Sequence, residues 1–352
     1  MPPDTPRCSS QSSGALLGSA IGDALAMPVH WYYNRLALAE DYGHVRDFLK
    51  PRNPHPDSIL WRSHYTALNE KGEILHDQAP FWGQRGVHYH QNLDAGENTV
   101  TLQLANLLQE SLLDCGGYDA DDYLDRYIAF MTTPGQHRDT YLEECHRGFF
   151  ENYARGNDRR RCGIPEKHIG GLASVIPLGV FFQDDPEEAF RATREHLSLT
   201  HPGSAMEQSA KLLLEVLLPV LGGGSLLETI RDLHSRQVSP LLGFSLEKLL
   251  TKSDEDVIGP VFSPACYVSE SVPGTLFLAA KYHDLPEEGL IANTNLGGDN
   301  VHRGAILGAL LGAENGASAW PDRWSGQLQQ LPTLLSGCSR WDETSAPLES
   351  AG

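Results

Sequence analysis

The stretch GALLGSAIGDALAMP, residues 14–28, has a glycine at every fourth position, and RGAILGALLGAENG, residues 303–316, repeats this spacing near the other end of the chain. Each Gly inside a helix costs about 1 kcal/mol relative to Ala, so three in register need a structural reason. Residues four apart lie on one helix face, and a strip of small residues there lets another helix approach closely. Both stretches are too short to span a bilayer. We therefore expect two buried helices in the core that can pack on each other.

Apolar residues recur at helical spacing through most of the chain, while strand-like alternation is scarce and no strand–helix–strand rhythm is seen. The sequence therefore predicts an all-α fold, a helical bundle within a single domain. The expected helices cover residues 14–26, 99–114, 119–131, 140–155, 186–198, 204–220, 225–235, 244–251, 270–283 and 302–315.

Residues 50–95 differ from the rest of the chain, because they are rich in Pro, His, Trp and Asn and show little periodicity. A stretch this long without regular structure is usually functional or disordered, and its aromatic residues argue against disorder. We expect an ordered loop insertion within one domain over residues 14–339, between a disordered lead at 1–13 and a tail at 340–352.

Composition limits the class of protein. The chain has 352 residues, with 27 Lys and Arg against 46 Asp and Glu, a net charge of −19. This charge argues against nucleic-acid and anionic-membrane partners and leaves a small molecule as the expected partner. The six cysteines are scattered without a C-x-x-C pair, and the polar N-terminus lacks a signal-peptide pattern. We therefore expect a cytoplasmic protein with reduced thiols. The sequence leaves its oligomeric state undetermined.

Polar side chains gather at the ends of three expected helices. They are Asp23, His30, Glu97, Asn98, Asp299 and His302. Asp299 and His302 are three residues apart at a helix start, so they can share one face. Glu97 and Asn98 precede another helix start, where the helix dipole stabilises a carboxylate. Each residue alone is typical of a helix cap or a buried hydrogen-bonding group, but together they predict one pocket for a metal or an anionic ligand.

Three motifs, in order, resemble signatures of the ADP-ribosylglycohydrolase family. GALLGSAIGDALAMP (14–28) resembles its N-terminal G-x-x-x-G-x-x-x-GDA-L-G-x-P pattern, and SLTHPGSAMEQSA (198–210) resembles a central Thr-His segment. NLGGDNVHRGAILGALLGAENG (295–316) resembles its C-terminal GGD-x-D-T motif and the helix that follows. The resemblance implies an all-α bundle with a two-metal centre, usually magnesium, at one end of a cleft. It also implies hydrolysis of N- or O-glycosidic bonds of ADP-ribose, with a small molecule or an ADP-ribosylated molecule as the substrate.

The sequence departs from the family pattern where the metals would bind. The acidic T-D-D-T run of the family corresponds here to Gly-Glu-Asn-Thr at residues 96–99, and a Glu after the first helix corresponds to His30. In the C-terminal motif Asp299 is retained, whereas Val301 and His302 stand in place of an Asp and a Thr. By this correspondence, hard oxygen ligands are lost and two imidazoles are gained.

The resemblance makes Glu97, Asp299, His302 and His30 the candidate metal ligands. Two imidazoles and two carboxylates suit zinc, manganese or iron better than magnesium, which prefers oxygen ligands. A site without metal is the alternative, because an imidazole beside a carboxylate can itself transfer protons near neutral pH. For catalysis we expect Glu97, with His30 or Asp299, to orient or activate water against the anomeric carbon.

The expected substrate-binding residues combine aromatic, basic, amide and glycine positions. They are Trp31, Trp82, Arg85, Tyr89, Asn98, Gly297 and Gly298. Aromatic rings can stack on a base and an arginine can hold a phosphate, although aromatics at this density are also common in protein cores. In the same loop His88 and His90 form an H-x-H pair, which is more typical of hydrogen-bonding groups than of metal ligands.

The sequence thus favours a hydrolase of a glycosidic bond in ADP-ribose or a related ribosyl compound, with a remodelled metal site. The alternative is a non-catalytic member of the family, either ligand-binding or structural in the manner of its crystallin-like members. Convergence of His30, Glu97, Asp299 and His302 in one pocket would favour the enzyme. Burial of these residues against one another without a cavity would favour the structural role.

Overall fold

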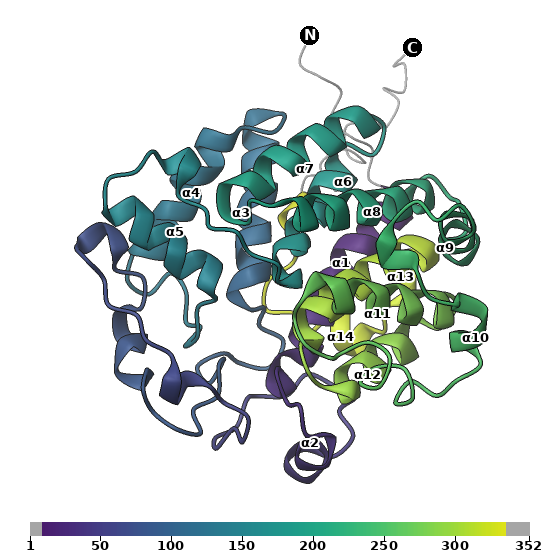
Figure 1. The fold of residues 1–352 in the computed structure, drawn as a ribbon, viewed down its shortest axis with the longest axis horizontal. Coiled ribbons are helices and arrows are strands. Elements are labelled where there is room, and N and C mark those ends of the chain that lie inside the picture. The colour runs from purple at the N-terminus through teal and green to yellow at the C-terminus, as the bar shows by residue number, and fades with distance from the viewer. Residues whose placement is uncertain (1–8, 336–352) are drawn as a thin grey trace, which may run out of the picture.

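The computed structural model describes residues 9–335, and within them the chain is built from helices and connecting loops (Figure 1). Two isolated β-bridges occur, but residues 9–335 contain no strand, so the predicted all-α class is confirmed. The α-helices are α1 (Ser10–Ala26), α2 (Arg35–Tyr42), α3 (Val100–Cys115), α4 (Ala120–Thr132), α5 (Glu144–Ala154), α6 (Val175–Phe181), α7 (Pro186–Thr200), α8 (Ser204–Leu221), α9 (Leu226–Ser235), α10 (Leu246–Leu250), α11 (Val268–Lys281), α12 (Pro286–Leu296), α13 (Asn300–Asn315) and α14 (Asp322–Ser325). The 3-10 helices are η1 (Met27–Val29), η2 (Leu60–Arg62), η3 (Glu70–Gly72), η4 (His76–Phe81), η5 (Arg159–Arg161), η6 (Ile169–Ser174), η7 (Pro240–Leu242) and η8 (Ala317–Ala319).

The two glycine-rich helices, α1 and α13, lie side by side in the core (Figure 1). Their glycines face one another in antiparallel order. The facing pairs are Gly14–Gly312, Gly18–Gly308 and Gly22–Gly304. A Cβ atom built on Gly18 would lie only 2.1 Å from the carbonyl oxygen of Gly308, and one built on Gly308 would lie 2.0 Å from that of Gly18. Because any side chain would force the helices apart, the expectation of two buried, closely packed helices is confirmed.

The first helix begins earlier than expected. Its N-cap is Ser9, whose Oγ accepts a hydrogen bond from the backbone N–H of Ser12 at 3.1 Å. Residues 10–13, which were expected in a disordered lead, therefore belong to α1, and that boundary was wrong. The remaining lead, residues 1–8, and the expected tail at 340–352 lie outside the described residues.

Four α-helices were absent from the sequence expectation, namely α2, α6, α12 and the four-residue α14. All seven residues of α6 are buried, so the segment has no polar face and produces no amphipathic pattern. The short helix α2 starts at Asn34, whose side chain accepts hydrogen bonds from two backbone N–H groups. Helix α12 begins with Pro286 at its first turn, a position where proline is favoured. Local capping residues, rather than apolar periodicity, mark the starts of α2 and α12.

The loop insertion wraps one side of the bundle and has no α-helix between residues 43 and 99 (Figure 1). It contains η2, η3 and η4 and packs around a small apolar cluster of its own, formed by Leu60, Val87 and Tyr89. Buried side chains such as His55 anchor it to the rest of the fold. The expectation of an ordered insertion agrees with this arrangement, and the insertion brings polar loop residues to the end of α1.

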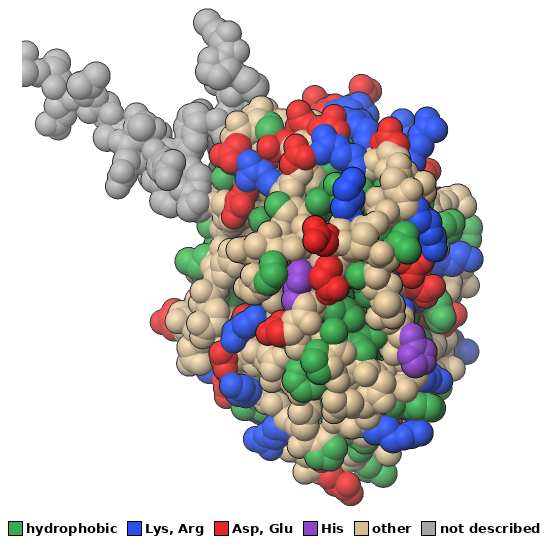
Figure 2. All heavy atoms as spheres, turned by 90° about the vertical axis from the view of Figure 1, so that its left-hand side faces the viewer, with side chains coloured by type: hydrophobic (Ala, Val, Ile, Leu, Met, Phe, Trp, Pro, Cys, Tyr) green, Lys and Arg blue, Asp and Glu red, His purple; other side chains and the backbone are tan. Residues whose placement is uncertain are grey.

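Charged side chains on the face shown in Figure 2 are mixed in sign over its upper part. Ion pairs of this kind join Arg126 to Asp122 at 2.7 Å and Arg160 to Asp121 at 2.7 Å. Exposed pairs like these contribute little stability, but they keep local charge balanced. Separately, no helix in residues 9–335 has the length and apolar character needed to cross a membrane.

Candidate functional site

The end of α1 and the start of α13 are held together by backbone hydrogen bonds. The N–H of Trp31 donates to the carbonyl oxygen of Gly298 at 2.8 Å, and the N–H of Gly298 donates to that of Tyr32 at 2.7 Å. Gly298 has φ of +67°, a conformation that other residues rarely adopt. This exchange of bonds places His30, just after η1, beside Asp299, just before α13.

Three side chains converge at this junction. The Oδ1 of Asp299 lies 3.0 Å from His30 Nε2 and 2.8 Å from His302 Nδ1. One ligand atom from each residue falls within 4.8 Å of the others, an arrangement that could hold a metal ion. The side chains are almost fully buried, with exposed fractions of 1% for His30, 0% for Asp299 and 2% for His302. The structure thus brings together three of the four expected metal ligands.

Each imidazole also contacts a partner through its second nitrogen. His30 Nδ1 lies 2.7 Å from His90 Nε2, and His90 Nδ1 lies 2.5 Å from Asp139 Oδ1. His302 Nε2 lies 3.0 Å from Glu143 Oε1. We call these six side chains the buried network, which in order of contact is Asp139, His90, His30, Asp299, His302 and Glu143.

Counting hydrogens shows that the buried network favours positive charge. The segment from Asp139 through His90 and His30 to Asp299 has three contacts, and each contact needs one hydrogen. Two neutral imidazoles carry two N–H groups. If His30 donates from Nδ1 to His90, its Nε2 lone pair faces the Asp299 carboxylate at 3.0 Å. With both imidazoles neutral, this contact therefore lacks a hydrogen, and a bound cation or an additional proton would stabilise it.

Burial and charge act in opposite directions on the titration of these groups. Burial lowers the pKa of His30 to about 3, against the opposing effect of Asp299. Burial also resists ionisation of Glu143, but the charge of His302 outweighs it and lowers the Glu143 pKa to about 2. Burial likewise disfavours the charged forms of His302 and Asp299, yet their mutual attraction raises the pKa of His302 and lowers that of Asp299. His302 is thus a cation between two carboxylates when metal is absent.

The donor set fits a divalent transition metal. Asp299 Oδ2 is buried and makes no hydrogen bond within residues 9–335, so this oxygen is free to bind a ligand, and His302 Nδ1 faces the other oxygen of the same carboxylate at 2.8 Å. If His30 bound a metal through Nε2, its Nδ1 would donate a hydrogen bond to His90. If His302 bound the metal through Nδ1, its Nε2 would donate to Glu143. This is the outer support that metal-binding histidines usually have. Two imidazole nitrogens and a carboxylate oxygen suit zinc, manganese or iron.

The family's acidic run is used differently in this chain. Asn98 Nδ2 donates to the carboxylate of Asp23 at 2.8 Å. The same carboxylate caps the start of α3, because it accepts a hydrogen bond from the backbone N–H of Thr99 at 2.9 Å. The carboxylate of Glu97 accepts from the guanidinium of Arg138 and, at 2.9 Å, from the backbone N–H of Asp94. Glu97 is therefore not part of the group formed by the two histidines and Asp299. A direct catalytic role for Glu97 stays a prediction.

Aromatic side chains cover the outer side of the site. The ring of Trp31 stacks on His30 with centroids 4.0 Å apart, and it meets the edges of Tyr89 at 4.6 Å and Tyr141 at 5.4 Å. Trp82 stacks in turn on Tyr141 at 5.5 Å. Three of the expected substrate-binding residues, Trp31, Trp82 and Tyr89, thus lie in one aromatic cover beside the buried network.

The remaining expected substrate-binding residues are placed elsewhere or act through their backbone. The guanidinium of Arg85 lies 4.0 Å from the ring centroid of Trp61 on an exposed part of the loop. A Cβ on Gly297 would lie 2.2 Å from the carbonyl oxygen of Tyr32, and one on Gly298 would lie 2.2 Å from that of Pro264. The contacts of both glycines are those of close backbone packing, and their role toward a substrate stays a prediction.

Sequence reasoning missed half of the buried network. The sequence marks His90 only as one of two loop histidines, and it gives no signal for Asp139 or Glu143. Asp139 also accepts a hydrogen bond from the backbone N–H of Val100 at 2.5 Å through its other oxygen. The H-x-H spacing was the one available signal for His90, because Asp139 and Glu143 lie in an irregular segment before α5 without periodicity.

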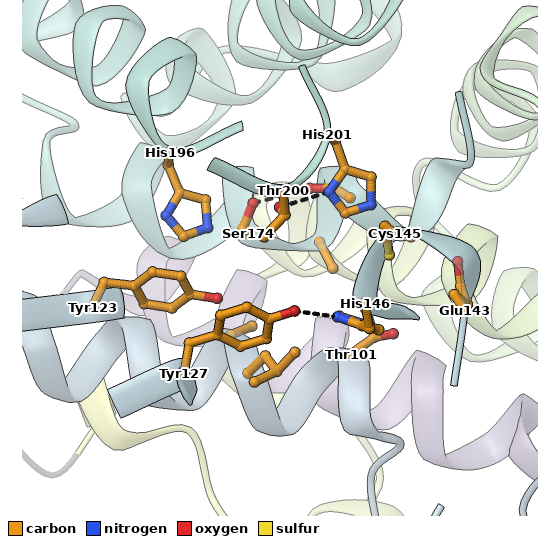
Figure 3. Close-up of a pocket in the computed structure, with 15 residues that line it drawn as sticks. Thr101, Tyr123, Tyr127, Glu143, Cys145, His146, Ser174, His196, Thr200 and His201 are labelled. Carbon is orange, nitrogen blue, oxygen red and sulfur yellow. Dashed lines mark hydrogen bonds between the residues drawn. The ribbon is translucent and has the colours of Figure 1, made fainter. Parts of the chain in front are cut away.

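The described conformation leaves little open space beside the buried network. A cavity of about 40 Å³ lies next to Glu143, between α4 and α5 on one side and the end of α7 on the other (Figure 3). Pockets that bind molecules the size of a nucleotide are typically several hundred Å³. The cavity is therefore too small for ADP-ribose, and a substrate of that size would have to displace part of the aromatic cover.

Comparison with known proteins agrees with the all-α fold and with the family resemblance of the sequence motifs. A solved structure described as an ADP-ribosylglycohydrolase-related protein complex has the same fold, with a TM-score of 0.59 at 22% identity over 94% of this chain and 98% of that chain. An uncharacterized protein of Archaeoglobus fulgidus is 25% identical over 315 residues, 88% of each chain. A model of the ADP-ribosylglycohydrolase family matches residues 4–347. Because this match covers nearly the whole chain, the protein belongs to the ADP-ribosylglycohydrolase family.

Proposed function

We propose that this protein is a metal-dependent hydrolase that cleaves a glycosidic bond in ADP-ribose or a related ribosyl compound. A transition-metal ion at His30, Asp299 and His302 would replace the family's usual two-magnesium centre. The observation that carries this proposal is the convergence of these three donors within 4.8 Å. Membership of a hydrolase family supports the reaction class.

Each residue has a distinct task in this proposal. His30 and His302 would hold the ion through Nε2 and Nδ1, because their other nitrogens contact His90 and Glu143. When bound, the ion supplies a Lewis acid that polarises a substrate oxygen and lowers the pKa of water. Asp299 would bind through one oxygen. Its other oxygen, Oδ2, has no hydrogen-bond partner within residues 9–335, so it could accept a proton from water directed at the anomeric carbon.

Access to the site requires movement of the aromatic cover. Trp31 stacks directly on His30 and has a positive φ of +60°, a conformation that costs about 1 kcal/mol or more for a residue other than glycine. This strain would be relieved if Trp31 changed conformation. A ribosyl group could then reach Asp299, and the displaced rings of Trp31 and Tyr141 could stack on a base.

A non-catalytic structural role is the second candidate. It is favoured by the nearly complete burial of His30, Asp299 and His302 together with the small volume of the adjoining cavity, about 40 Å³. In this role the buried network would be a polar part of the core, with protons in place of a metal. The two candidates differ in metal content and in turnover.

The test combines metal analysis with hydrolysis assays. Protein loaded with zinc, manganese or iron would be assayed with ADP-ribose linked through nitrogen and through oxygen. We expect turnover that is lost in the Asp299→Asn and His302→Ala variants and kept in the His44→Ala variant, in which the histidine is exposed. Turnover that survives His302→Ala would contradict the proposed site. A folded, metal-loaded protein without turnover on either linkage would favour the structural role.

A further inference from the structure

A small cavity with a mixed polar and apolar lining lies beside Glu143, at one end of the buried network. Figure 3 shows Tyr127 and His146 along one side of it, and Thr200 and His201 along the other. Its volume is about 40 Å³. The lining is contributed by α3, α4, α5, η6 and α7, so five separate elements meet around a single small space.

The cavity adjoins His302 through residues that contact both. Glu143 Oε1 and Thr101 Oγ1 lie 3.0 Å and 3.2 Å from His302 Nε2, and both residues line the cavity. Gly170 also lines it, and a Cβ at this position would lie 3.2 Å from the His302 ring. The cavity is thus separated from His302 by residues that contact the imidazole directly.

One buried nitrogen at the cavity wall has no partner. His201 Nδ1 lies 2.8 Å from Thr200 Oγ1, but His201 Nε2 is buried and makes no hydrogen bond within residues 9–335. Buried polar groups in folded proteins nearly always have a partner, and ordered water supplies it where protein does not. The opposite wall offers His146, whose Nδ1 lies 2.8 Å from the Tyr127 hydroxyl.

The charges around the cavity suit a neutral, hydrogen-bonding ligand. Burial lowers the pKa of His146 to about 4 and the pKa values of His196 and His201 to about 3, so these three imidazoles are neutral near pH 7. Glu143 is the acidic side chain among the lining residues. Water can bond both to the carboxyl group of Glu143 and to an imidazole, because it donates and accepts hydrogen bonds.

We propose that this cavity is an internal water site. Its volume of about 40 Å³ would hold about two or three water molecules, since each needs on the order of 10–15 Å³. One water bonds to His201 Nε2, and the others continue to Glu143. The site is a property of the folded chain and does not depend on the proposed function.

The experiment counts long-lived internal waters by ¹⁷O magnetic relaxation dispersion of the full chain. Ala105 lines the cavity, and the Ala105→Val variant adds two methyl groups that fill most of it. We expect this variant to lose about two or three long-lived waters relative to the unmodified protein. The control is Ala129→Val on the exposed face of α4, which should keep the full count. An equal count in Ala105→Val would overturn the proposal.

A second measurement covers the case in which Ala105→Val fails to fold. A high-resolution crystal structure of the unmodified protein should show ordered water within hydrogen-bond distance of His201 Nε2 and Glu143. A dry cavity would overturn the water site. Because neither measurement involves metal or turnover, failure here is distinguishable from failure of the proposed hydrolase activity.

Discussion

A single oxygen of Asp299 contacts two imidazoles that come from opposite ends of the chain. His302, three residues later, lies 2.8 Å from Asp299 Oδ1. His30, which is 269 residues away in sequence, lies 3.0 Å from the same atom. Asp299 is therefore the point at which the two halves of the buried network join, and a change there affects both.

The Asp299→Asn variant should be strongly destabilised. Removing one member of a buried ion pair typically costs about 3–5 kcal/mol, because the other charge is left uncompensated. Chemical denaturation of the metal-free protein at neutral pH would measure the loss. The Asp256→Asn variant changes an exposed aspartate and should unfold like the unmodified protein. Equal stability of both variants would show that the contact between Asp299 and His302 carries no charge.

Asp139 should act on the metal site through His90, as a positioning residue. Its carboxylate fixes the orientation of His90, which in turn contacts His30 Nδ1. Loss of such outer support usually lowers metal affinity about 10–100-fold. Calorimetric titration of the Asp139→Asn variant with zinc or cobalt should show this decrease. Asp94→Asn, at an exposed ion pair with Lys50, should bind with unchanged affinity, and an unchanged affinity for Asp139→Asn would argue against the relay through His90.

Magnesium should not bind tightly at this site. Asn98 and Val301 stand where the family pattern has carboxylates, and imidazole is a poor ligand for this hard ion. Titration of metal-stripped protein should therefore detect a transition metal and not magnesium at micromolar concentrations. The transition-metal signal should disappear in a variant with His30 and His302 both replaced by Ala. Micromolar magnesium binding that survives this double replacement would contradict the site as described.

Gly308 should not tolerate even a methyl group. The Gly308→Ala variant gains about 1 kcal/mol of helix propensity, yet its Cβ would lie 2.0 Å from the Gly18 carbonyl oxygen. We expect overpacking to dominate, with a net loss of about 1–3 kcal/mol measured by denaturant unfolding. At Gly117 a Cβ meets no atom within 4 Å, so Gly117→Ala is the control. A stability gain at Gly308 would mean that the helices are less closely packed.

His196 should make stability fall as the solution becomes acidic. Burial lowers its pKa from 6.5 to about 3 in the folded protein, so between these values the unfolded state binds a proton that the folded state does not. Stability therefore decreases as pH falls from 6.5 toward 3. In this range the free energy of unfolding should depend less steeply on pH in the His196→Phe variant, with a slope smaller by up to about 1.4 kcal/mol per pH unit. Exposed His44→Phe is the control, and equal slopes in all three proteins would refute the prediction.

The parts of the fold that could be predicted depend on local pattern. Glycines at a fixed spacing are visible in the sequence, and so is the i, i+3 relation of Asp299 to His302. The direction of the Glu97 side chain was not, because it is set by Arg138, 41 residues away. Asp139 and Glu143 join the buried network through tertiary contacts from a segment without periodicity, so no spacing rule could find them.

The pairing of α1 with α13 also sets the order in which the protein can be completed. Most of α1 is buried, and its principal neighbour is the helix that ends at Asn315. On the ribosome α1 emerges long before α13, so its glycine face lacks its partner until residues 300–315 have been synthesised. Contacts this distant in sequence form slowly and leave apolar surface exposed in the meantime. A nascent chain that stops before residue 299 would lack both α13, the helix that packs on the glycines of α1, and Asp299, at which the two halves of the buried network join.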